Sequence, residues 1–120
     1  MKSELINEDI AEQVMNEIGV CKEGTEIMLP KTKFRLLRIY KVRSAVANIL
    51  KQEMLAAGGD VAVLAGTVNC AKPETDVLVI GNLTQYRILA KKMMAQAKIG
   101  IKDCKEVARV IENALDLKNF

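Results

Sequence analysis

The side chains that most often carry out catalysis or bind metals are scarce in this sequence. It contains no histidine, and its three cysteines, Cys21, Cys70 and Cys104, are far apart along the chain. A metal site needs several converging ligands, and a nucleophilic serine or cysteine normally needs a nearby base, most often histidine. Paired carboxylates stay open as acid–base groups, although the acids at 8–12 are typical of a helix N-terminus. We expect no catalytic residue, no metal site and no bound cofactor.

Glycine-containing turns are the next candidates, because backbone amides at the start of a helix bind phosphate. Gly58 and Gly59 precede a predicted strand, which is the reverse of the order in phosphate loops, so they are better explained as the end of a helix. Gly81 and Asn82 do lie between a predicted strand and a predicted helix. They are the candidate residues for binding a small anion such as a pterin or a nucleotide.

Positive charge is concentrated in one segment of the chain. Residues 1–29 carry seven acids and two lysines, a local charge of −5, whereas residues 30–52 carry seven bases and no acid. Such a segment fits an acidic partner, a nucleic acid or the acidic N-terminal segment of the same chain. Aromatic residues make up only 3% of the sequence, which disfavours nucleic acid because few rings are present to stack on bases. The candidate interaction surface consists of Lys31, Lys33, Arg35, Arg38, Lys41 and Arg43.

Hydrophobic periodicity predicts the elements that position these residues. Apolar residues at helical spacing predict four helices, at 7–18, 44–57, 82–98 and 103–115. Apolar runs predict four strands, at 26–29, 34–42, 61–65 and 77–80, with a further short strand open at 67–70. The alternation in 34–42 slips, which a bulge near Leu37–Arg38 or an edge position explains.

The order of elements is therefore α-β-β-α-β-β-α-α, with no linker or repeat. We expect one α/β domain spanning residues 1–120, with an α+β arrangement as the alternative. Unbroken apolar runs at 61–65 and 77–80 predict interior strands of a mixed sheet of about four strands, with helices packed on it. No apolar run is long enough to cross a membrane and no secretory signal is recognised, so we expect a cytoplasmic protein.

The middle of the chain resembles a known family. The residues that carry the resemblance are Ala47–Leu55, Gly58–Val63, Gly66–Cys70 and Thr75–Gly81, together with Ile27–Lys31 and Gln85–Tyr86. In this order they resemble the N-terminal extension of a long form of dihydropteroate synthase, which precedes the catalytic barrel. The resemblance covers roughly residues 19–115. Ala65 and the segment 96–100 depart from the usual pattern of the extension.

The resemblance implies a link to folate and pterin metabolism rather than an activity. The catalytic motif of the synthase is absent, and 120 residues cannot form a barrel of about 250 residues. We therefore expect a non-catalytic accessory module that docks to a pterin-binding barrel, to a second copy of itself, or to both. Small-anion binding at Gly81 and Asn82 is the alternative function, and nucleic-acid binding through residues 31–43 is less favoured.

Overall fold

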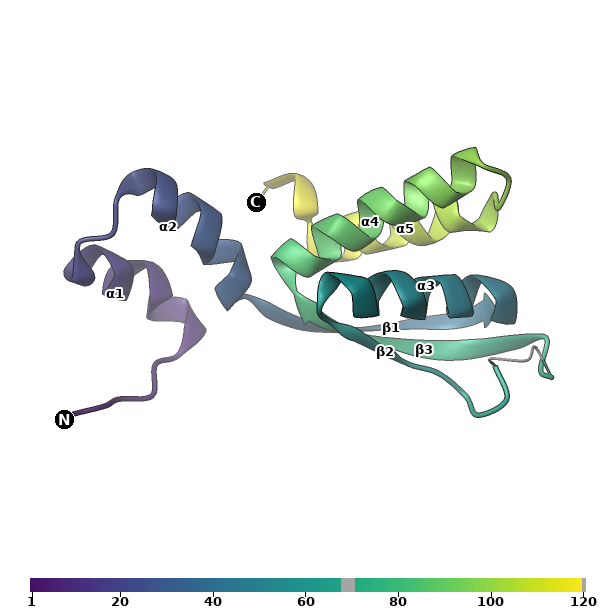
Figure 1. Cartoon of the computed structure of the whole chain (residues 1–120), viewed down its shortest axis with the longest axis horizontal. Helices are drawn as coiled ribbons and strands as arrows, with labels where there is room; N and C mark the ends of the chain where they lie inside the picture. The colour runs from purple at the N-terminus through teal and green to yellow at the C-terminus, as the bar shows by residue number, and fades with distance from the viewer. Residues whose placement is uncertain (68–70, 120) are drawn as a thin grey trace.

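The chain folds as a small α/β domain in which one face of an antiparallel sheet is covered by helices. The computed structural model describes residues 1–67 and 71–119. Among these residues the sheet has three strands, β1 (Phe34–Arg43), β2 (Asp60–Ala62) and β3 (Glu74–Asn82), in the order β1-β3-β2. Both strand pairs are antiparallel. Helices α3 (Ser44–Ala57), α4 (Leu83–Lys98) and α5 (Asp103–Leu115) lie together on one side of this sheet (Figure 1).

The N-terminal segment projects from one end of this two-layer body (Figure 1). A 3-10 turn at Glu8–Ile10 leads into α1 (Ala11–Ile18), and α2 (Lys22–Met28) continues into a second 3-10 turn at Leu29–Thr32. A third 3-10 turn, at Leu117–Asn119, follows α5. No residue of α1 is buried, so this helix contributes little to the core.

The core lies between the sheet and the three covering helices. Its members come from every element of the body, and the largest fully buried ones are Tyr86, Leu50, Met54, Leu83, Leu89, Met93 and Ile111. Gly59, at the start of β2, lets this strand approach closely, because a Cβ there would lie 2.5 Å from the carbonyl oxygen of Ile80 on β3. The core is almost entirely aliphatic, as the low aromatic content requires.

Helices α1, α3, α4 and α5 agree well with the sequence-based predictions, whereas α2 was not predicted. Gly58 ends α3 with a φ of 98°, as expected for a left-handed cap. Asn82 caps α4, and its side chain and that of Gln85 form the reciprocal hydrogen bonds of a capping box. Ser44 is the first residue of α3, and its hydroxyl donates to the carbonyl of Lys72.

The strands differ more from the predictions. The predicted strand at 26–29 is wrong, because these residues belong to α2 and the turn after it. Cys21 starts that helix, its sulfur accepting a hydrogen bond from the Gly24 amide at 3.4 Å, and Pro30 fits the first turn of the 3-10 helix that follows. The sheet thus has three described strands rather than four, and its pairings are antiparallel rather than mixed. Thr67 lies in a turn, and the rest of the predicted strand at 67–70 lies outside the described residues.

Candidate docking surface

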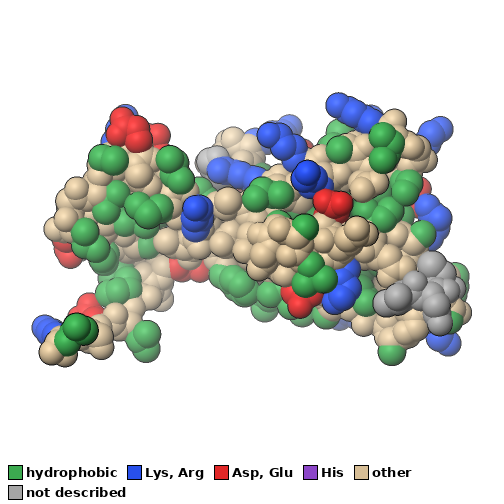
Figure 2. Space-filling model, viewed as in Figure 1, with side chains coloured by type: hydrophobic (Ala, Val, Ile, Leu, Met, Phe, Trp, Pro, Cys, Tyr) green, Lys and Arg blue, Asp and Glu red, His purple; other side chains and the backbone are tan. Residues whose placement is uncertain are grey.

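The face of the sheet opposite the helices is uncovered and largely apolar. Residues of β1 and β3 alternate between the two faces, so Val77 and Val79 are buried under the helices while Leu78 between them is exposed. The uncovered face carries Phe34, Leu36, Arg38 and Tyr40 from β1, Asp76, Leu78 and Ile80 from β3, and Ala62 from β2. We call this set the open face. Figure 2 shows apolar side chains along the lower edge of the molecule, beneath the strands of Figure 1.

The centre of the open face is formed by cross-strand pairs. Leu36 lies opposite Ile80, and Leu78 lies between Arg38 on one side and Ala62 on the other. The side chains of Phe34 and Leu36 are 55% and 62% exposed, which is far more than aliphatic and aromatic residues of a covered sheet show. Contiguous exposed apolar residues of this kind mark interaction surfaces in soluble proteins.

The charged groups of the open face neutralise one another at one end of it. The guanidinium of Arg38 donates to Asp76 at 2.8 Å and stacks over the ring of Tyr40, 4.6 Å from its centroid. The backbone amide of Lys41 donates to the other carboxylate oxygen of Asp76 at 3.0 Å. These two donors, the amide first, hold the pKa of Asp76 below its ordinary value, and the bond to Asp76 raises the pKa of Arg38.

β1 contains a β-bulge close to its C-terminal end. Ile39 pairs with Val77 and Val42 pairs with Thr75, so Tyr40 and Lys41 together oppose the single residue between those partners. Lys41 adopts a φ of 53°, in the left-handed region. The bulge was expected near Leu37–Arg38, which is wrong, because the alternation is regular up to Tyr40. The alternative expectation, an edge position, is confirmed, since β1 lies at one edge of the three described strands. The bulge brings Val42 back to the buried face.

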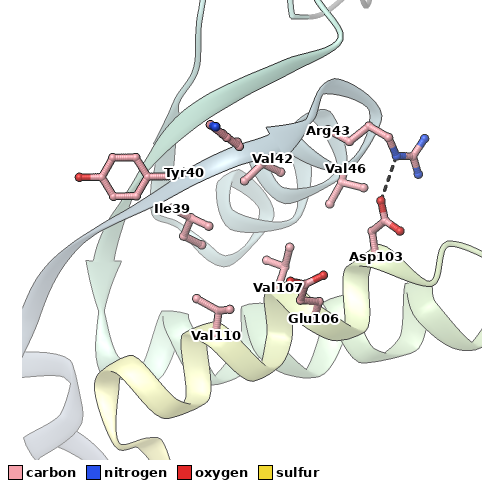
Figure 3. A pocket seen from close by; sticks show the side chains of 10 residues that line it. Ile39, Tyr40, Val42, Arg43, Val46, Asp103, Glu106, Val107 and Val110 are labelled. Carbon is pink, nitrogen blue, oxygen red and sulfur yellow. Dashed lines mark hydrogen bonds and ion pairs between the residues drawn. The ribbon is translucent and has the colours of Figure 1, made fainter.

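Next to this bulge, a small hollow of about 110 Å³ separates the end of β1 from α5. Figure 3 shows the side chains of Val42, Val107 and Val110 around it, with the ion pair between Arg43 and Asp103 at its rim. The Arg43 Nε lies 3.0 Å from the Asp103 carboxylate. Sites for small organic ligands are generally several times larger, so the hollow is too small to hold a pterin or a nucleotide.

The six bases of the candidate interaction surface do not form one patch. Glu8, which precedes α1, lies 3.2 Å from Arg35 and 3.9 Å from Lys33, so two of the bases contact the acidic N-terminal segment of the same chain. Arg38 and Arg43 belong to the ion pairs described above. Lys31 and Lys41 are exposed, and the ion pairs formed between described residues include neither. Charge pairing within the chain thus accounts for four of the six bases.

Gly81 and Asn82 have clear roles in packing and capping. The side chain of Asn82 accepts from the Gln85 amide at 2.9 Å, so its oxygen is already engaged at the N-terminus of α4. A Cβ on Gly81 would lie 2.8 Å from the Gln85 side-chain oxygen and would crowd the end of the Met54 side chain, so these two side chains pack closely over this glycine. Anion binding at these residues stays a prediction.

The cysteines are separated in the part of the chain that the structure describes. Cys21 is exposed at the start of α2, Cys104 is buried on α5, and Cys70 lies outside the described residues. Burial raises the pKa of the Cys104 thiol, which keeps it protonated. Across residues 1–67 and 71–119, no three histidine, cysteine or acidic side chains come close enough to hold a metal ion. In those same ranges, no helix has the length and apolar character needed to span a bilayer.

Two surfaces were not anticipated from the sequence. The first is the open face. Phe34 and Leu36 alternate along β1 and so share one face, but the residues between and after them that point to the opposite face are also apolar, so the sequence does not show which face is covered. The second surface is a row of cations on α4, formed by Arg87, Lys91 and Lys98. Their spacing of four and seven residues could have indicated it, since such residues share one face of a helix.

Comparisons with known proteins add no relative to this picture. No family model matches the chain, and neither a curated protein nor a solved structure matches it. The resemblance to the extension of dihydropteroate synthase therefore depends on the sequence segments given above.

Proposed function

We propose that this chain is a non-catalytic interaction module that docks through its open face, and that its partner is a pterin-binding barrel protein. The observation that carries the docking is the uncovered apolar centre of the sheet, where Leu36, Leu78 and Ile80 adjoin one another across the strands. The choice of partner depends on the sequence resemblance, which implies folate and pterin metabolism.

The chemistry of the open face suits a protein partner better than a charged small molecule. Arg38 and Asp76 satisfy each other, so docking against them requires no separate counter-ion. Burying exposed aliphatic side chains is favourable by about 25 cal/mol for each Å² of apolar surface removed from water. Phe34 and Tyr40, at opposite ends of the face on β1, supply aromatic side chains of the kind that contribute most to protein interfaces.

The test replaces the centre of the open face without disturbing the core. Leu36→Glu combined with Leu78→Glu should abolish binding to a purified pterin-binding barrel protein, measured by calorimetric titration. Both side chains are exposed, so we expect the fold to be retained, which circular dichroism checks. The matched control is Leu55→Glu with Ile88→Glu, which changes two exposed apolar residues on α3 and α4 and should leave binding unchanged.

The outcomes separate the surface from the partner. If the Leu36→Glu, Leu78→Glu variant binds the barrel as tightly as the wild type does, the open face is not the docking surface. If the wild type binds no barrel, the partner is wrong. If the wild type instead forms dimers that only this variant loses, the open face serves self-association.

A further inference from the structure

A groove with an apolar floor and a basic rim runs along the seam between α4 and α5. Two adjoining hollows of about 320 and 370 Å³ share Met94 as a lining residue and together form this groove. Its floor is made of Ala90, Met94, Ala97 and Leu117. Its cations are Arg87, Lys91, Lys98, Lys102, Lys105 and Lys118. Figure 2 shows lysine and arginine side chains over the upper side of the molecule, where α4 and α5 lie in Figure 1.

These cations have no counter-ions within the described part of the chain. The ion pairs formed between described residues involve none of them, and Glu112 is the one acid among the described residues that line the groove. The Nη2 atom of Arg87 is buried and has no hydrogen-bond partner among the described groups. A buried donor without an acceptor is unfavourable, so an anionic group that bonds to Arg87 would remove this cost.

The composition of the groove favours an acidic peptide over a nucleic acid. The floor is aliphatic and the described lining residues include no aromatic ring on which a base could stack. An amphipathic acidic segment can place aliphatic side chains against Met94 and Ala97 while its carboxylates reach the lysines of the rim. Helix-in-groove recognition uses this combination of apolar anchors and complementary charge.

The chain itself carries such a segment in residues 1–18, which we call the acidic arm. It contains five acids and one lysine. No residue of α1 is buried, and Leu5 and Ile18 are 103% and 74% exposed. The arm also makes the chain elongated, with a radius of gyration of 16.6 Å against about 14 Å for a compact chain of this length. Glu8 already pairs with Arg35 and Lys33 of the same chain, whereas Glu12 and Glu17 are exposed, so the remainder of the arm and the groove carry opposite charge.

We propose that the α4–α5 groove binds the acidic arm of a second copy of this chain. Reciprocal exchange of two arms gives a closed dimer with two-fold symmetry, in which each groove is filled once. Glu12 and Glu17, both exposed on α1, then face the lysines of the partner's groove. This inference goes beyond the docking function and uses a different surface, so it stands or falls independently of the open face.

The test measures oligomeric state by light scattering during gel filtration of the full chain. The wild type should be a dimer at about 50 mM salt, and higher salt should weaken the dimer because exposed charges are screened. Lys91→Glu with Lys98→Glu in the groove should raise the dimer dissociation constant at least tenfold, and so should Glu12→Lys with Glu17→Lys in the arm. An equimolar mixture of these two variants should restore the dimer, since the reversed charges of the groove then face the reversed charges of the arm, and the unchanged groove and arm face each other.

A matched control changes net charge equally outside the groove. Lys31→Glu with Lys72→Glu replaces two exposed lysines and should leave the dimer intact. A monomeric wild type at about 50 mM salt would overturn the proposal, and so would a mixture of the two reversed variants that stays monomeric. Single-stranded oligonucleotide binding that the groove variant loses, with no change in oligomeric state, would replace the acidic arm by phosphate as the occupant.

Discussion

The hydroxyl of Tyr86 links the helical layer to the two strands that carry most of the open face. Tyr86 is fully buried on α4, and its hydroxyl lies 2.8 Å from the carbonyl oxygen of Val79 on β3 and 3.0 Å from that of Arg35 on β1. Tyr86→Phe keeps the ring and removes the donor to both carbonyls. Leaving buried acceptors without this donor should lower the free energy of unfolding by about 1–3 kcal/mol. At roughly 4 °C for each kcal/mol in a domain of this size, Tm should fall by about 4–12 °C.

The chain offers a matched control for this change. Its only other tyrosine, Tyr40, is 64% exposed on the open face, so Tyr40→Phe should change the free energy of unfolding by less than about 0.5 kcal/mol. Both variants can be measured by urea denaturation followed by circular dichroism. If Tyr86→Phe is as stable as Tyr40→Phe, the hydroxyl does not hold the strands to α4 and this reasoning is refuted.

The same hydroxyl should make stability depend on alkaline pH. Burial raises the pKa of Tyr86 from 10.0 to about 12. The folded state therefore keeps its proton at pH values where the unfolded chain loses it, so the contribution is complete below about pH 10 and is lost as pH rises to about 12. Tyr86→Phe should show a shallower alkaline loss of stability than the wild type. Equal slopes in the two proteins would contradict the raised pKa.

Three further predictions concern the bulge, the cap and the ion pair. Lys41→Gly should raise the free energy of unfolding by about 0.5–1 kcal/mol in urea denaturation, because glycine adopts the φ of 53° without steric cost; a loss would show that the lysine side chain matters more. Asn82→Ala removes the capping box with Gln85 and should cost about 1 kcal/mol, with faster hydrogen exchange at the Gln85 amide, whereas unchanged exchange would argue against the cap. The Lys41 amide and then Arg38 lower the pKa of Asp76 from 3.8, so its stabilisation is complete above about pH 4 and is lost as pH falls further; Asp76→Asn should flatten this acid decline in stability, and an unchanged decline would count against the hydrogen bonds of Asp76 to the Lys41 amide and Arg38.

The helices could be predicted from the sequence because their signals are local. Gly58, Asn82 and Gln85 each act within one turn of the helix that they end or begin, so a short window contains all the information. The apolar run at 26–29 contains no local capping signal of this kind. Four apolar residues before a proline fit either a strand or the end of a helix, and the contacts that decide between them come from elsewhere in the chain.

The candidate site could be predicted only in part because pairing depends on distant residues. The sequence shows the number of bases in residues 30–52, but the acids that neutralise Arg35, Arg38 and Arg43 lie 27, 38 and 60 residues away. The charge pattern suggested only the contact of Arg35 with Glu8, because residues 1–29 are acidic and residues 30–52 are basic. The open face could not be predicted without knowing how the strands pair, because both faces of β1 carry apolar residues.

The arrangement of layers leaves one face of the sheet uncovered among the described residues. All three long helices lie on one side of the sheet (Figure 1), so the described residues enclose one core and leave the other side of the sheet open. Exposed Leu36 and Leu78 gain nothing in the isolated chain, since burial is what makes apolar side chains favourable. A surface composed of such residues is stabilised only when a partner covers it. Charge reversal of Arg38 would break its pair with Asp76 as well as alter the face, so the glutamate substitutions at Leu36 and Leu78 are the cleaner test of the proposed docking through the open face.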